Sequence, residues 1–142
     1  MTERDACMIE WNKLEAPSLA ELETIADAAY ARLPARFRGL TGDLLIRVED
    51  FPTDEVLDSL GIESAFDLLG LYSGIDLAQK SVSDVPSVPD MVFLYRRPIL
   101  DYWAEHEEAL GAIITHVLVH EIGHHFGLSD ADMQRIEAEA VG

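Results

Sequence analysis

The chain has 142 residues, of which 49% are hydrophobic and 26% charged, with a formal net charge of −17 and a single cysteine. This length and composition fit one globular domain and exclude a wholly disordered chain. The charge argues against nucleic acid and anionic membranes as partners, and one cysteine excludes a disulfide framework or a multi-cysteine zinc site. With no secretory signal and no apolar segment long enough to span a bilayer, we expect a soluble cytoplasmic protein.

The N-terminal part is predicted to begin with a polar segment and continue as a helix. Residues 1–16 are polar and are expected to be loosely ordered. Ser18 and Glu21 have the spacing of a capping box, and apolar residues recur at helical intervals over residues 18–33. Pro34 then stops the helix. This helix is interpreted as scaffold.

The rest of the chain alternates short strands and helices without a regular repeat. Residues 81–90 contain two prolines and are predicted to form a loop of the kind that borders a cleft. Pro98 is expected to open a helix at its favoured first position. This irregular order predicts a single domain over residues 1–142, of the α+β class, with a small mixed sheet packed with helices. Strands are predicted over residues 43–51, 68–76 and 91–97, and helical segments over residues 53–61, 63–70, 98–109, 109–127 and 129–140.

The stretch HEIGHHFGLSD, residues 120–130, lies on the most apolar of these helices. The helix is apolar on nearly every side, which predicts burial, and Gly127 is suited to end it. Unpartnered histidine and glutamate are costly to bury, so they need a role. His120 and His124 lie on one face and can reach one ion, whereas Glu121 lies beside them. The spacing indicates two zinc ligands and a general base on one turn.

The longer pattern is specific. The chain's own composition gives about 0.02 chance matches to H-E-x-x-H, and around one in ten thousand once Gly127 and an aspartate or histidine at position 130 are required. Asp130 is the expected third ligand, which leaves a fourth position for water, although it could instead serve only as a helix N-cap. Asp132 is an alternative ligand that also suits the first turn of the last helix.

Neighbouring aromatic and histidine residues have competing interpretations. His116 lies one turn before the first motif histidine, where it could support the ligands, line a cleft or simply be buried. His125 points away from the ligand face and is expected to pack or hydrogen-bond elsewhere. Tyr72, Tyr95 and His116 are candidates for stabilising an oxyanion.

HEIGHHFGLSD resembles H-E-x-x-H-x-x-G-x-x-[HD], the extended zinc motif of metzincin-type metalloproteases. The context FLYRRPI followed by THVLVHEIGHHFGLSDADM is similar to a family of short bacterial proteins described as minimal matrix-metalloprotease-like, zincin-like domains, most strongly over residues 91–133. The resemblance implies a zincin-like fold with its active-site helix near the C-terminus. It also implies Zn²⁺ bound by His120, His124 and Asp130, with Glu121 as the base.

The resulting prediction is a zinc-dependent metallopeptidase that acts on a peptide or protein substrate. Zinc would polarise the scissile carbonyl and acidify water, and Glu121 would move the proton to the leaving amine. The substrate would add to a strand, MVFLYRR or GLYSG. The alternatives are a catalytically silent metal-bearing module that binds a peptide or partner, and a structural zinc site; Glu121 favours the enzyme. Met133 is expected to pack beneath the site, and a ligand at Glu137 would indicate the gluzincin branch. The oligomeric state stays open.

Overall fold

The structure, a computed structural model, describes residues 9–74 and 89–141. Its sheet has three strands in the order β1 (Leu45–Glu49), β3 (Met91–Tyr95) and β2 (Gly70–Ser73). β1 runs parallel to β3, and β2 runs antiparallel to it. The sheet is therefore mixed, and the predicted α+β class is confirmed.

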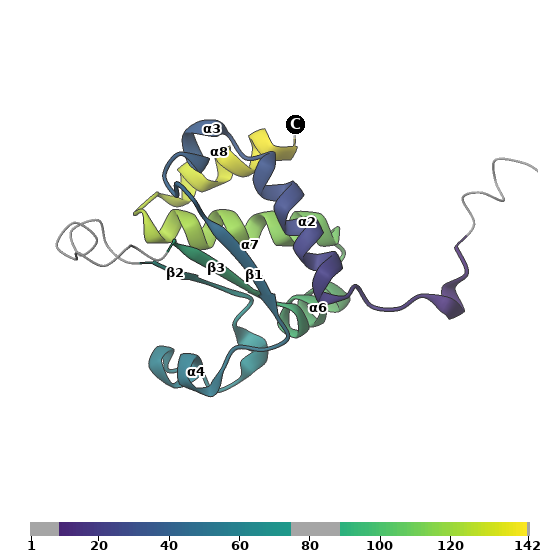
Figure 1. Ribbon diagram of the computed structural model, residues 1–142. Coiled ribbons are helices and arrows are strands. Elements are labelled where there is room, and N and C mark those ends of the chain that lie inside the picture. The colour runs from purple at the N-terminus through teal and green to yellow at the C-terminus, as the bar shows by residue number, and fades with distance from the viewer. Residues whose placement is uncertain (1–8, 75–88, 142) are drawn as a thin grey trace, which may run out of the picture.

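Helices cover one face of this sheet (Figure 1). α7 (Leu110–His125) packs against β2 and β3, while α2 (Leu19–Ala31) packs against β1 and α7. α8 (Asp130–Val141) lies along α7, and α4 lies at the opposite end of the sheet from α3 and α8. The other helical elements are η1 (Trp11–Lys13), α3 (Ala35–Arg38), α4 (Asp54–Leu60), η2 (Ala65–Asp67) and α6 (Arg96–Glu105).

The first long helix begins where the capping box predicts. The Glu21 amide donates to the Ser18 hydroxyl at 3.1 Å, and the Ser18 amide donates to the Glu21 carboxylate at 3.0 Å. These bonds satisfy two amides that a helix start leaves without partners. The apolar face of α2 then packs on α7, which places α2 in the scaffold.

The core lies between the sheet and the helices. Ile46 and Val48 of β1 are partly buried on its inner face, and their neighbours along the strand are exposed, as the alternation predicts. Val92 and Leu94 of β3 are fully buried. One cluster joins these strands to the helices; its largest fully buried members are Phe37, Leu22, Leu33, Leu94, Ile99, Ile114, Leu118, Ile122, Met133, Val92 and Val119.

The helix predicted to open at Pro98 begins two residues earlier, at Arg96, and ends at Glu105. The predicted boundary is wrong because a proline fits anywhere in the first turn, where the missing amide has no partner to lose. Arg96 itself links this end of the sheet to the N-terminal segment: its Nε donates to the Pro17 carbonyl at 2.6 Å. Its Nη1 also lies 3.2 Å from an oxygen of Asp50.

Two other predictions concern the N-terminal segment and the loop before β3. The described part of the N-terminal segment extends away from the body of the protein (Figure 1), and Ile9, Trp11 and Leu14 are exposed. Of the predicted loop at residues 81–90, all but the last two residues lie outside the described ranges. Within those ranges, no helix combines the length and apolarity needed to cross a membrane.

Candidate metal centre

α7 is buried along most of its surface, as predicted, but one stripe of it is polar. His116, His120 and His124 are spaced four residues apart and form what we call the histidine stripe. His116 and His124 are exposed, and His120 is partly buried. The stripe therefore lies at the border between core and solvent, where an ion can reach it.

The turn after α7 directs the chain back along the histidine stripe. Gly127 has a φ of 74°, and the next amide donates to the Gly123 carbonyl at 2.8 Å, the bond pattern of a Schellman ending. Ser129 caps α8, because its hydroxyl accepts the Asp132 amide at 3.1 Å. Asp130 is thus the first residue of α8 rather than its cap, which leaves its carboxylate available to a ligand.

Asp132, the alternative ligand, has the contacts of a helix-start residue. Its carboxylate accepts the Ser129 amide at 3.4 Å and also pairs with Arg135 on the next turn. Hydrogen bonds from Ser129 and then from Arg135 hold the pKa of Asp132 below its usual value. These contacts give Asp132 a local role in α8.

Met133 packs against α7 next to the histidine stripe. It is fully buried, and its sulfur lies against Gly123, next to His124 in the chain. A Cβ at Gly123 would overlap this sulfur. The absence of a side chain at Gly123 is therefore what allows α8 to lie this close to α7.

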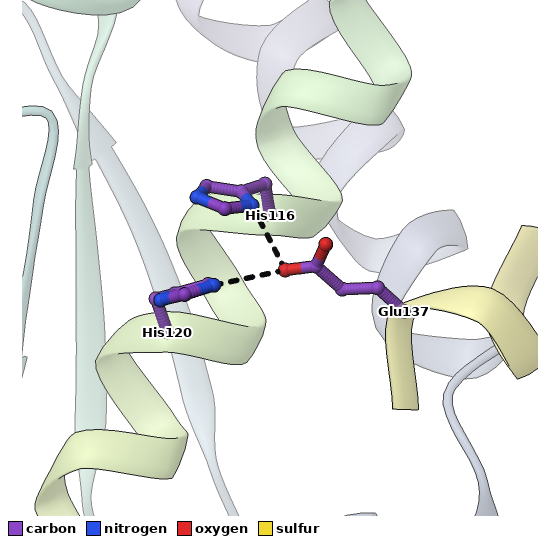
Figure 2. Close-up of side chains that lie close together, drawn as sticks. All are labelled: His116, His120 and Glu137. Atoms are coloured by element: carbon purple, nitrogen blue, oxygen red, sulfur yellow. Dashed lines mark ion pairs between the residues drawn. The ribbon is translucent and has the colours of Figure 1, made fainter. Parts of the chain in front are cut away.

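The group of ligand-type side chains that the structure brings together comes from both helices. Among the described residues, His116, His120 and Glu137 form the group whose ligand atoms all lie within 4.8 Å of one another. Glu137 Oε1 is 2.9 Å from His116 Nδ1 and 3.2 Å from His120 Nε2. In Figure 2 this oxygen points between the two rings, with Glu137 reaching across from α8. We call these three side chains the His–His–Glu group.

His124 and Asp130, the other two ligands that the motif implies, are not members of this group. The ring of His124 lies edge-on to that of His120, with centroids 5.5 Å apart. Asp130 is exposed, and its charge is close enough to act on the pKa of His120. Both side chains thus flank His120, the residue that the motif set and the His–His–Glu group share.

The environment of His120 favours its neutral form. Burial lowers the pKa of His120, and the neighbouring His116 and His124 lower it further, while Glu137 and Asp130 oppose this. Neutral imidazole is the form that binds a metal. In addition, His120 Nε2 and Glu137 Oε1 are buried and make no hydrogen bond, and both are atoms that can bind a cation. These residues fit a zinc ion.

Glu121 faces the sheet rather than the His–His–Glu group. A Cβ built at Gly70 of β2 would lie 3.5 Å from Glu121 Cγ and 2.6 Å from Val117 Cγ1, so β2 and α7 meet closely here. Burial raises the pKa of Glu121, and His124 partly opposes the shift. Because a raised pKa makes a carboxylate a stronger base, this shift is in the direction that a general base requires.

Aromatic residues surround the far end of α7. His125 stacks on Tyr72, with ring centroids 4.0 Å apart, and so packs away from the histidine stripe as expected. The Tyr72 hydroxyl donates to Asp90 at 2.5 Å. Tyr95 is only 2% exposed, so a substrate has no access to it. Of the three oxyanion candidates, Tyr72 and His116 keep some exposure.

The pairing of His116 with Glu137 was not predicted, although the sequence carries a signal for it. Glu137 follows Asp130 by seven residues, which places both carboxylates on one face of α8. A helix turned back along the histidine stripe presents that face to α7. The missing information was the closeness of the two helices, which depends on Met133 fitting against Gly123.

A mixed sheet covered by a histidine-bearing helix defines an α+β protein with a candidate metal centre. The sequence profile of the family described as zincin-like metallopeptidase matches residues 41–140, which run from before β1 to the last turn of α8. The chain belongs to this zincin-like metallopeptidase family. No curated protein matches the chain.

Proposed function

We propose that this protein is a zinc-dependent peptidase that cleaves peptide bonds in a peptide or protein substrate. His120, His124 and Asp130 hold the ion, and Glu121 acts as the general base. Membership of the zincin-like metallopeptidase family supports the class of reaction. The four-residue spacing of the two histidines on α7, and the position of Asp130 directly after the turn at Gly127, support this ligand set.

The observation that carries the proposal is the environment of Glu121. Its side chain is partly buried with Cγ near Gly70 of β2, its pKa is raised, and it lies next to His120 in the chain. A structural zinc site has no need of a basic carboxyl beside its ligands. Glu121 accepts the proton of the attacking water and passes it to the leaving amine. Zinc, when bound, supplies Lewis acidity that polarises the scissile carbonyl.

The sheet suggests where the substrate lies. β3 is flanked by β1 on one side and β2 on the other, so MVFLYRR has no free edge to offer a peptide. Within the described residues β2 is an edge strand, and Gly70 at its start packs next to Glu121. A peptide that adds to β2 as a further strand is therefore brought close to the proposed base.

The test is Glu121→Gln in the zinc-loaded protein, assayed against a broad peptide library. Glutamine keeps the size and hydrogen bonding of the side chain but removes its basic oxygen. We expect cleavage to fall by about 10²–10⁴-fold, the usual contribution of a general base, while zinc content and thermal unfolding are retained. Glu107→Gln, in the exposed segment before α7, is the matched control and keeps full activity.

Two results would overturn the proposal. A Glu121→Gln protein that cleaves at the parent rate removes the assigned base. A parent protein that is fully loaded with zinc and cleaves nothing in the library favours the alternative of a metal-bearing module that binds a peptide or partner.

A further inference from the structure

The His–His–Glu group is distinct from the ligand set of the proposed peptidase, with which it shares only His120. We propose that His116, His120 and Glu137 form a second metal-binding position for a zinc-like divalent cation, built between α7 and α8. This position goes beyond the proposed function and does not depend on it. It rests on the two contacts that Figure 2 marks between these side chains and on two buried atoms that make no hydrogen bond.

The two distances to Glu137 are close to those between ligands of one ion, and all three ligand atoms lie within 4.8 Å of one another. Two ligands of a tetrahedral zinc ion, each bonded at about 2.0–2.2 Å, lie about 3.3–3.6 Å from each other. Glu137 Oε1 lies 3.2 Å from His120 Nε2 and 2.9 Å from His116 Nδ1. Movements of a few tenths of an ångström, on the order of ordinary side-chain freedom, open these separations to coordination distances.

The hydrogen bonding of the group supports the same conclusion. His120 Nε2 and Glu137 Oε1 are both buried, and neither makes a hydrogen bond. The two atoms lie 3.2 Å apart, but a buried nitrogen and a buried carboxylate oxygen normally make hydrogen bonds as well, because leaving them without any is unfavourable. A cation bound by both atoms satisfies them together. The side chain of His116 is 57% exposed, which gives the ion a path from solvent.

The two positions have His120 in common. Its Nε2 faces Glu137 and serves the second position, while the motif position adds His124 and Asp130 to the same side chain. The two positions also engage α8 differently. Asp130 is the first residue of that helix, whereas Glu137 lies two turns later. An ion in the second position therefore ties the distal half of α8 to the middle of α7.

The test uses a background variant that carries His124→Ala and Asp130→Asn together. This variant lacks two of the three motif ligands but keeps all three residues of the second position. We expect this variant to bind one zinc ion, measured by competition with a chromophoric chelator. Adding Glu137→Gln or His116→Ala should lower that affinity at least tenfold. Adding Glu139→Gln should leave it unchanged, since Glu139 lies on the same helix but pairs with Arg36 at 2.9 Å.

Three outcomes of this titration separate the second position from the motif position. A background variant that binds no zinc overturns the second position and leaves the motif set intact. Residual binding that Glu137→Gln does not weaken also overturns it. The third outcome is a background variant that binds zinc as tightly as the parent and loses this binding when Glu137→Gln is added. It supports the second position and shows that His124 and Asp130 are not ligands.

A second measurement uses chains with a single substitution, so that folding of the multiple variant does not decide the result. Hydrogen exchange of the parent, recorded with and without excess zinc, should show added protection of α8 amides after Met133. Glu137→Gln should abolish this added protection, and Glu139→Gln should retain it. Protection that persists in Glu137→Gln contradicts the proposal.

Discussion

The sulfur of Met133 occupies the space that a side chain at Gly123 would fill, and this close approach sets the distance between the last two helices. It explains why a histidine on α7 and a glutamate on α8 come into contact. It also yields a direct prediction, because a methyl group at Gly123 would overlap the sulfur. Gly123→Ala should lower the free energy of unfolding by about 1–3 kcal/mol, the usual effect of overpacking a core. Urea unfolding without metal measures it.

The control for this substitution lies on the same helix. A Cβ at Gly111 meets no atom within 4 Å. Gly111→Ala should therefore keep or raise stability, by up to about 1 kcal/mol from the higher helix propensity of alanine. Equal effects of Gly111→Ala and Gly123→Ala would show that helix spacing does not depend on this contact.

A second prediction concerns the contact between β2 and α7. Gly70→Ala places a methyl group 2.6 Å from Val117 Cγ1, which forces the strand and the helix apart. Peptidase activity should fall, because Glu121 loses part of its buried surroundings. Zinc affinity should change less than twofold (about 0.4 kcal/mol), because no proposed ligand lies at this contact. Activity assays and chelator competition on one preparation check both. An equal loss of both would mean that β2 supports the ligands as well.

A third prediction follows from the shared position of His120. His120→Ala should abolish tight zinc binding in any background, since both proposed positions need this ring. His125→Ala should leave zinc affinity unchanged, because His125 stacks on Tyr72 away from the histidine stripe. Zinc titrations of the two variants give the comparison. Tight binding by His120→Ala would contradict both positions.

A fourth prediction concerns alkaline pH and Tyr95. Burial, followed by the charges of Glu49 and Glu121, raises the pKa of Tyr95 to about 12 from a usual value of 10.0. Between these values the unfolded chain loses the phenol proton while the folded chain keeps it, so folding stability falls as pH rises. The loss from this residue should approach about 2 kcal/mol near pH 12.

Tyr95→Phe isolates this effect. The variant lacks the phenol proton, so its stability should fall less steeply than that of the parent between pH 10 and pH 12, as measured by urea unfolding at each pH. Parallel curves for the two proteins would show that Tyr95 titrates normally in the fold.

Local signals in the sequence predicted several elements of the fold and the family. The capping box at Ser18 and Glu21, the alternation along β1 and the glycine stop at Gly127 depend on near neighbours in the chain, and all three are present. The family expected from HEIGHHFGLSD is confirmed by the match over residues 41–140.

The order of the strands and the His–His–Glu group were beyond prediction from local signals. That β3 lies between β1 and β2 depends on pairing between segments far apart in the chain. Glu137 reaches His116 because α7 and α8 pack closely. This packing depends on the lack of a side chain at Gly123, where the sulfur of Met133 fits. The motif also predicts His124 and Asp130 as ligands, and that assignment stays a prediction until the zinc titrations are done.

The contact between Gly70 and α7 has a consequence for how the protein folds. The histidine stripe and Glu137 lie on consecutive helices, so they meet by closing one short turn around Gly127. Glu121 gains its buried surroundings only when β2, from much earlier in the chain, docks on α7, and closing a longer loop is slower. We expect refolding in the presence of zinc to show metal uptake first and protection of β2 amides later. The chain would thus bind metal before Glu121 gains the burial that raises its pKa.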